Sequence, residues 1–234
     1  MKQLNNFKNI HSNEDIYVYA SGKSCDYIDN SFFDNKIVIG VNQSYKRLKP
    51  QYLVRKEYEL LKTIINDSNL DDVIHFVSRG NCGNHQSKNK EYIESHFKDK
   101  SNIVVYNHDY NHNFIRALPV EEEKLIVSAS TITTAIHLAA YMGAKNIIIV
   151  GHDCGLLNGD SNFKGYHTEE TIKISRNPNI EPQKDYNSWL KNIEGHTITL
   201  KKLLMKKYKC NILSLNPFIN FNLEGNKYQK TNMF

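Results

Sequence analysis

The stretch SASTITTAIHLAAYMGAKNIIIVGHDCGLLNG, residues 128–159, decides the fold because it contains a helix and a strand in immediate succession. Residues 131–142 are rich in alanine and other apolar residues and predict a helix, and Gly143 is suited to end it in the left-handed conformation. Residues 146–150 form an apolar run with three isoleucines, the pattern of a strand that is covered on both faces. A helix that leads into such a strand is typical of an α/β protein.

Both ends of this unit carry candidate ligand-binding residues. Ser130 and Thr131 stand at the start of the helix, where hydroxyls and free backbone N–H groups can bind an anion. Gly151 and Asp153 follow the strand at its carboxyl end. Because ligands of open α/β sheets bind outside the carboxyl ends of the strands, we expect the ligand to lie against these four residues.

The rest of the chain repeats this alternation of strands and helices. β-Branched and aromatic runs predict strands, and apolar residues at helical spacing predict helices. The predicted strands are 16–20, 37–41, 52–55, 73–78, 103–106, 125–127 and 211–215, and the predicted helices are 57–66, 91–97 and 184–208. The pattern predicts one α/β domain over residues 1–234, with a Rossmann-like, mainly parallel sheet and helices on both faces.

Four segments are expected to depart from this regular pattern. Residues 1–14 are polar and predict a loosely held N-terminus, and the asparagine-rich residues 107–113 predict a loop. Gly195-His196 is expected to interrupt the last helix. Residues 154–183 are rich in glycine, asparagine and proline, and a loop this long is usually functional, so we predict a lid-like insertion over 154–190.

The first predicted strand runs into the turn Ser21-Gly22-Lys23-Ser24. The turn is not a P-loop, because Tyr17 stands where that motif requires a glycine. Gly22 lacks a Cβ and allows backbone N–H groups to approach a ligand closely, although an ordinary tight turn would also use glycine. A strand, a glycine turn and a helix start form the usual nucleotide site, so we expect the turn to bind a nucleotide.

The second predicted strand ends in Asn42-Gln43. Each side-chain amide offers a donor and an acceptor, which can recognise a base edge or ribose hydroxyls. Turn formation is the alternative role, since asparagine is common in turns.

Composition limits the partners. The chain has 30 Lys and Arg against 25 Asp and Glu, a net charge of +5. This mild excess suits an anionic small ligand, but no basic cluster carries the aromatic residues of an RNA-binding module, so nucleic acid is not an expected partner. Association into a homo-oligomer and peripheral contact with a membrane remain open.

Neither a structural metal nor a secretory or membrane segment is predicted. The four cysteines lack metal-binding spacing and are too few for a disulfide framework. His108, Asp109 and His112 would suit a metal only on a helix, and their asparagine neighbours favour a loop. No apolar run approaches the ~20 residues that cross a bilayer, and the N-terminus is unlike a signal peptide, so we expect a cytoplasmic protein.

Several motifs, taken in order, resemble the metal-independent bacterial sialyltransferases of lipooligosaccharide biosynthesis. The same pattern is shared with a wider group of Maf-type flagellin glycosyltransferases and pterin-diphosphokinase-like domains. The motifs are Ser21-Gly22-Lys23-Ser24, Asn42-Gln43, Ser130-Thr131, Gly143, Gly151-His152-Asp153, Gly195-His196, Tyr208-Lys209 and the strand that ends at Pro217.

This resemblance implies a glycosyltransferase that moves a sugar from a nucleotide-activated donor, CMP-linked, to a glycan acceptor without a metal. It implies donor binding by Gly22, Ser24, Asn42 and Thr131. It also implies that His196 is the general base, and a neutral imidazole with a pKa near ~6.5 can accept a proton at working pH. Lys23 and Tyr166 would support the leaving phosphate.

Two other functions fit the same pattern. A pterin-type diphosphokinase would transfer pyrophosphate from ATP and would need Mg²⁺, which Asp153 and Asp160 could bind. A non-catalytic nucleotide- or glycan-binding module would use the same fold without a base. The fold class does not choose among these functions.

Overall fold

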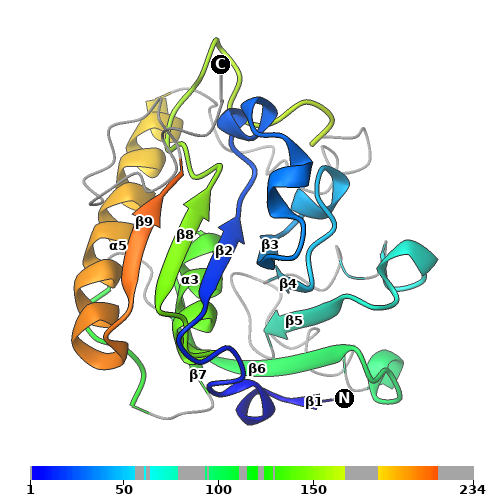
Figure 1. The fold of residues 1–234 in the computed structure, drawn as a ribbon. Helices are drawn as coiled ribbons and strands as arrows, with labels where there is room; N and C mark the ends of the chain where they lie inside the picture. Colours follow the sequence, from blue (N-terminus) through cyan, green and yellow to red (C-terminus); the bar gives the residue numbers. More distant parts are fainter. Residues whose placement is uncertain are drawn as a thin grey trace.

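A nine-stranded sheet forms the centre of the computed structural model, and its described strand pairs are all parallel (Figure 1). The structure describes residues 2–55, 61, 64–78, 93, 95–110, 115–120, 124–128, 130–166 and 184–215. Within these ranges, residues 108–110 and 184–190 are described by their backbone alone. The strands are β1 (Lys2–Gln3), β2 (Asp15–Tyr19), β3 (Ile37–Val41), β4 (Tyr52–Arg55), β5 (Ile74–Ser78), β6 (Ile103–Tyr110), β7 (Lys124–Val127), β8 (Asn146–Val150) and β9 (Asn211–Ser214).

The order of the strands reverses at β2. The sheet runs β1-β6-β5-β4-β3-β2-β8-β9, and β7 pairs with β6 outside this path. From β2 the chain therefore moves outward through β3, β4 and β5, and later returns to the other side of β2 with β8 and β9. Such a reversal opens a crevice at the carboxyl ends of the central strands, where ligands of this architecture bind.

Two helices, α3 (Thr131–Tyr141) and α5 (Lys184–Tyr208), cover one face of the sheet (Figure 1). Ile16 and Val18 of β2 and Ile147 and Ile149 of β8 belong to the same buried cluster as α3. Every side chain of α3 is buried, because the helix packs against the sheet and also against α5. Period-2 alternation along the strands sends the intervening side chains to the opposite face.

The opposite face is covered by short helical segments. Tyr17 and Tyr19 of β2 pack against Phe33, which lies in the 3-10 helix η3 (Asn30–Phe33). Toward β4 and β5, Leu61 and Phe97 join the buried cluster on this side. The prediction of an α/β, Rossmann-like and mainly parallel sheet with helical cover on both faces is confirmed.

The predicted loop over residues 107–113 is wrong for its first half. Residues 107–110 continue β6 and pair in parallel with β7, residue Asn107 opposite Lys124. The backbone pairing with β7 outweighs the low strand propensity of asparagine, because propensity is a weak guide where a neighbouring strand is available. His112, part of the metal spacing considered above, lies outside the described residues.

The loosely held N-terminus is also a wrong prediction. β1 pairs with β6, and the 3-10 helix η1 (Leu4–Phe7) buries both of its end residues. The Phe7 ring packs edge-on against Phe76 with centroids 4.9 Å apart and against Tyr52 at 6.2 Å. Two apolar residues, Leu4 and Phe7, are enough to hold the N-terminal segment against the sheet, because they pack into the buried cluster that contains Tyr52 and Phe76.

The expected interruption of the last helix does not occur. α5 passes through Gly195-His196 without a break. Ile193, Thr197 and Leu200 form a buried stripe at helical spacing that continues on both sides of the exposed Gly195. A glycine inside a helix costs about 1 kcal/mol relative to alanine, which the burial of this stripe outweighs.

The predicted helices 57–66 and 91–97 and the lid-like insertion fall partly outside the described residues. Of the lid, residues 154–166 are described and 184–190 belong to α5. Among the described helices, none combines the length and the apolar character that a bilayer-crossing segment needs.

Candidate functional site

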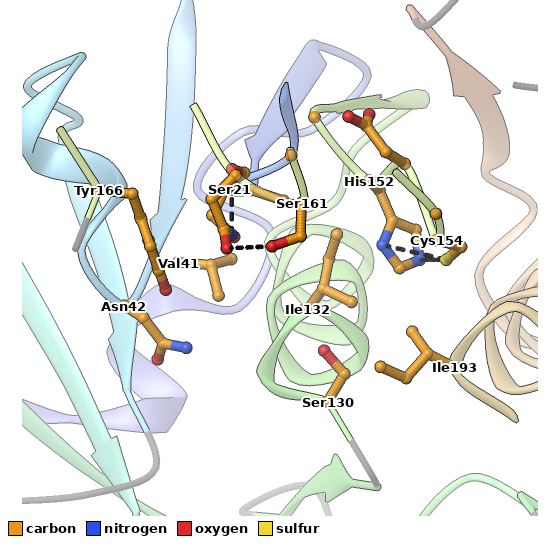
Figure 2. Close-up of a pocket in the computed structure, with 16 residues that line it drawn as sticks. Ser21, Val41, Asn42, Ser130, Ile132, His152, Cys154, Ser161, Tyr166 and Ile193 are labelled. Carbon is orange, nitrogen blue, oxygen red and sulfur yellow. Dashed lines mark hydrogen bonds between the residues drawn. The ribbon is translucent and has the colours of Figure 1, made fainter. Parts of the chain in front are cut away.

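A pocket of about 440 Å³ lies at the carboxyl ends of β2, β3 and β8, beside the first turn of α3 (Figure 2). Its volume is within the range of about 300–1,000 Å³ that is typical of small-molecule sites. The lining residues are Ala20, Ser21, Gly22, Val41, Asn42, Ser130, Ile132, Gly151, His152, Asp153, Cys154, Gly155, Ser161, Asn162, Tyr166 and Ile193. The pocket thus occupies the crevice where the strand order reverses.

The structure brings together many of the residues singled out from the sequence. Those that line the pocket are Ser21, Gly22, Asn42, Ser130, Gly151, Asp153 and Tyr166. Those that do not line it are Lys23, Ser24, Gln43, Thr131 and His196. Figure 2 shows Asn42 and Tyr166 on one side of the pocket and His152 and Cys154 on the other, with Ser130 and Ile132 between them.

Asp153 joins the turn after β2 to the loop after β8. Its Oδ1 accepts a hydrogen bond from the Ser24 hydroxyl at 2.5 Å, and its Oδ2 accepts one from the Ser24 backbone N–H at 2.8 Å. Burial raises the pKa of the Asp153 carboxyl, and the two bonds from Ser24 act in the opposite direction. Asp153 therefore holds the wall of the pocket together, and Ser24 contributes to the site through it.

Gly22 and Gly151 allow these two segments to touch. The Gly22 N–H donates to the Gly151 carbonyl at 2.7 Å. A Cβ on Gly22 would overlap the Asp153 carboxylate, and a Cβ on Gly151, which has a φ of +65°, would overlap the Cys25 sulfur. In this structure the two glycines serve close packing between protein segments.

The described part of the predicted lid is docked on the turn after β2. Asn162 donates from Nδ2 to the Ser21 hydroxyl at 2.9 Å, and the Phe163 N–H donates to the Ser21 carbonyl at 2.9 Å. The buried Phe163 ring packs edge-on against Tyr166. These contacts place residues 161–166 along the edge of the pocket.

Lys23 is held by two carboxylates at the outer side of this segment. Its Nζ lies 2.7 Å from Asp160 and 3.2 Å from Asp26, and hydrogen bonds to these two groups raise the pKa of Lys23. Lys23 and Asp160 line a second cavity of about 310 Å³, which shares Tyr166 with the first. The positive charge of Lys23 is thus balanced within the protein.

Tyr166 is oriented by Gln43. The Tyr166 hydroxyl donates to Oε1 of the buried Gln43 at 2.9 Å, and Lys46 donates to the Tyr166 carbonyl at 3.0 Å. Asn42 adopts a left-handed conformation, with a φ of +53°, and its backbone N–H donates to the Val54 carbonyl. Asn42 and Gln43 therefore have different roles. Asn42 lines the pocket, and Gln43 orients Tyr166 through a hydrogen bond.

The start of α3 faces the pocket through Ser130. Ser130 is the N-cap residue, as predicted, with extended backbone angles and no side-chain capping bond. Its carbonyl accepts the hydroxyl of Thr133 at 2.7 Å, and that hydroxyl also contacts Ser128 at 2.8 Å. Thr131 is buried. Hydrogen bonds within the protein thus connect Ser128, Ser130 and Thr133 at the first turn of α3.

Sequence reasoning missed His152, Cys154, Asn162 and Ile193 as lining residues. The first two adjoin predicted site residues in the loop after β8, and this adjacency was the available signal. His196 is buried in α5, three residues from Ile193, which lines the pocket. His196 does not line the pocket itself, and its role as general base stays a prediction.

The two carboxylates considered for Mg²⁺ have different partners. Asp153 is bonded to Ser24 through both oxygens, and Asp160 pairs with Lys23. Within the described part of the chain no group of three or more His, Cys, Asp or Glu side chains is arranged for a metal ion.

Comparison with known proteins yields fold relatives and no sequence relatives. No protein-family model matches the chain, and no curated protein matches it by sequence. The fold is similar to that of an α-2,3-sialyltransferase, Cst-I, from Campylobacter jejuni, with 16% identity, a TM-score of 0.52 and coverage of 92% of this chain and 81% of that one. It is also similar to a Maf glycosyltransferase from Magnetospirillum magneticum, with 14% identity, a TM-score of 0.51 and coverage of 89% of this chain. The chain spans 33% of that protein's length.

Proposed function

We propose that the chain is a glycosyltransferase that moves a sugar from a CMP-linked donor to a hydroxyl of a glycan acceptor. The observation that carries the proposal is the single pocket formed by the turn after β2, the loop after β8 and the start of α3 at the reversal of strand order. Two glycosyltransferases, one of them a sialyltransferase, share this fold.

The chemistry of the described pocket wall suits the hydroxyl-rich parts of a nucleotide-sugar donor. Among the described residues that line the pocket, Asp153 is the only charged one, and its carboxylate is bonded to Ser24. Hydroxyls and amides from Ser21, Asn42 and Asn162 suit the hydroxyls of ribose and of a sugar.

Neutral groups are assigned to the phosphate in this proposal. Backbone N–H groups at the start of α3 favour an anion through their direction and the helix dipole. The Tyr166 hydroxyl, already oriented by Gln43, would stabilise the charge that develops on the leaving phosphate. Lys23 can bind the phosphate only if its ion pairs with Asp26 and Asp160 break.

His196 is the proposed general base. As the acceptor hydroxyl loses its proton to the imidazole, its oxygen forms a bond to the anomeric carbon of the donor. The bond from that carbon to the phosphate oxygen breaks, and CMP leaves with the electron pair. His196 is buried in α5, one helical turn from Ile193, which lines the pocket, and the proposal requires its ring to reach the acceptor hydroxyl when substrates are bound.

The test is His196→Ala, measured as release of CMP from CMP-N-acetylneuraminate in the presence of EDTA and a glycan mixture. We expect kcat to fall by about 10²–10⁴, the usual contribution of a general base. Thr199→Ala is the matched control, because Thr199 lies on the same helix and, in the described part of the chain, its hydroxyl donates to the Gly195 carbonyl within that helix. Melting temperatures establish that both variants fold.

Turnover by His196→Ala at the wild-type rate would exclude His196 as the base. If the folded wild-type protein releases no CMP with any of the acceptors, the proposed transferase activity is contradicted.

A further inference from the structure

Arg55 is the last residue of β4, and its side chain is enclosed by the protein, with only 1% of the residue exposed. An arginine is almost never fully buried unless a partner balances its charge, because removing a charge from water is costly. The groups around Arg55 therefore indicate whether the protein itself supplies that partner.

One edge of the Arg55 guanidinium group lacks a partner in the described part of the chain. Its Nε and Nη2 atoms are both buried, and neither has a hydrogen bond to a described residue. In a planar guanidinium group these two nitrogens lie on the same edge and can donate two parallel hydrogen bonds to a carboxylate or a phosphate. The unused edge therefore has the geometry that recognises an oxyanion.

The described neighbours of Arg55 do not balance its charge. The Tyr45 ring, in the 3-10 helix η4 (Ser44–Lys46), lies 5.4 Å from the guanidinium carbon. An aromatic face attracts a cation, but a phenol is neutral at pH 7 because its ordinary pKa is ~10. Burial lowers the pKa of Arg55 to about 10, and Tyr45 and Tyr166 act in the opposite direction. Arg55 is therefore protonated at pH 7 beside neutral tyrosines.

His75 of β5 supplies no negative charge either. Burial, together with the nearby charge of Arg55, lowers the pKa of this imidazole to about 4. A buried charge without a counter-charge reduces the stability of the free protein, and a bound anion would recover that stability.

The position of Arg55 in the sheet connects it to the pocket. Val54, the preceding residue, pairs with Val41 of β3, and its carbonyl accepts the Asn42 N–H at 3.1 Å. Val41 and Asn42 both line the pocket. Figure 2 shows Asn42 on the same side of the pocket as Tyr166, the residue that acts on the pKa of Arg55. Arg55 thus ends the next strand along the same edge of the sheet.

We propose that Arg55 is the counter-charge for an oxyanion of the substrate, a phosphate or a carboxylate, and that it forms an anion-binding subsite beside the pocket. This inference rests on the proposed function, because a CMP-linked donor carries a phosphate and an acidic donor sugar adds a carboxylate. Arg55 does not line the pocket in this structure, so the proposal requires a side-chain movement in the intervening wall when the anion binds.

The first test determines whether the chain itself balances Arg55. Arg55→Met removes the buried charge, and Lys145→Met, which removes an exposed positive charge at the amino end of β8, is the control for net charge. Without ligand, we expect the urea midpoint of Arg55→Met to equal or exceed that of the wild-type protein, because an apolar side chain replaces an unbalanced buried charge. A midpoint below those of the wild-type protein and Lys145→Met would reveal a counter-charge within the chain and overturn the proposal.

The second test identifies the anion. Dissociation constants for cytidine, CMP and CMP-N-acetylneuraminate are measured by calorimetry. We expect Arg55→Met to bind at least one of the two charged probes at least about tenfold more weakly than the wild-type protein, the value of a charge-assisted hydrogen bond, and to bind cytidine equally well. Weaker binding of CMP assigns Arg55 to the phosphate, and weaker binding of CMP-N-acetylneuraminate alone assigns it to the carboxylate.

Unchanged affinities for both charged probes, or an equal loss for cytidine, would overturn the proposal. A wild-type protein that binds neither charged probe would contradict the proposed function. The subsite is then judged with inorganic phosphate against chloride at equal ionic strength. Phosphate should raise the urea midpoint of the wild-type protein and of Lys145→Met but not that of Arg55→Met, and the same response in all three proteins would overturn the subsite.

Discussion

Between pH 7 and pH 5 the free energy of unfolding is expected to fall by roughly 6 kcal/mol, because burial lowers the pKa values of three of the described histidines. Burial lowers the pKa of His75 to about 4 and the pKa values of His137 and His152 to about 3. In the unfolded chain each returns to about 6.5. The unfolded state therefore binds more protons below pH 6.5, and each histidine loses about 2 kcal/mol of stabilisation by pH 5.

The environment of His137 shows why protonation and the native structure conflict. The Ile126 N–H donates to His137 Nδ1 at 3.0 Å, which requires a lone pair on that nitrogen. The neighbouring Thr134 hydroxyl donates to the Ile126 carbonyl at 2.9 Å, so α3 satisfies both backbone groups of this residue of β7. A proton on Nδ1 would face the backbone N–H and break the bond.

Urea unfolding at pH 7, 6 and 5 measures this effect. The stabilising contribution of the neutral histidines is complete above pH 6.5 and is lost as the pH falls toward 4. Asp153 acts in the opposite direction, because its raised pKa favours the native state as pH falls, but it is a single group. His75→Leu removes one of the three and should reduce the pH dependence by about a third. Equal stability of the wild-type protein at pH 7 and pH 5 would contradict the lowered pKa values of His75, His137 and His152.

Gly151→Ala is expected to destabilise the protein by about 2–4 kcal/mol. A φ of +65° disfavours any residue with a Cβ, at a cost of about 1 kcal/mol. The larger part comes from the fully buried Cys25 sulfur, which the new methyl group would overlap. Overpacking of a close-packed interior costs about 1–3 kcal/mol or more. Chemical denaturation of wild-type and variant proteins measures the difference.

Cys25→Ala separates the two causes. In that background the sulfur is absent, and Gly151→Ala should cost only about 1 kcal/mol, the backbone term. A cost that is unchanged by Cys25→Ala would show that the overlap with Cys25 is not the reason for the glycine.

The strands of the sheet were predictable because their apolar, β-branched runs are buried on both faces. Residues 146–150 match β8 at both ends, and the predicted start of α3 at Thr131 is also correct. The pairing of residues 107–110 with β7 was not predictable, because it depends on a strand distant in the chain. The burial of Phe7 among Tyr52 and Phe76 was hidden for the same reason.

The location of the site was predictable to a greater degree than its contacts. Position after a strand indicated Gly22 and Asp153 as candidate residues, and the structure places both in the lining of one pocket. It could not show that Asp153 bonds Ser24, since that contact joins residues 129 positions apart. His152 contacts Thr197 of α5, and no local pattern in the sequence connects the two.

The most direct test of the proposed function is a thermal shift with CMP in EDTA, set beside ATP with Mg²⁺ and ATP with EDTA. A ligand at about 100 times its dissociation constant stabilises the native state by about 2.7 kcal/mol, which raises the melting temperature by several degrees, on the order of 5–10 °C, in a protein of this size. We predict a shift with CMP that survives EDTA. A shift with ATP that appears only with Mg²⁺, and none with CMP, would contradict the account.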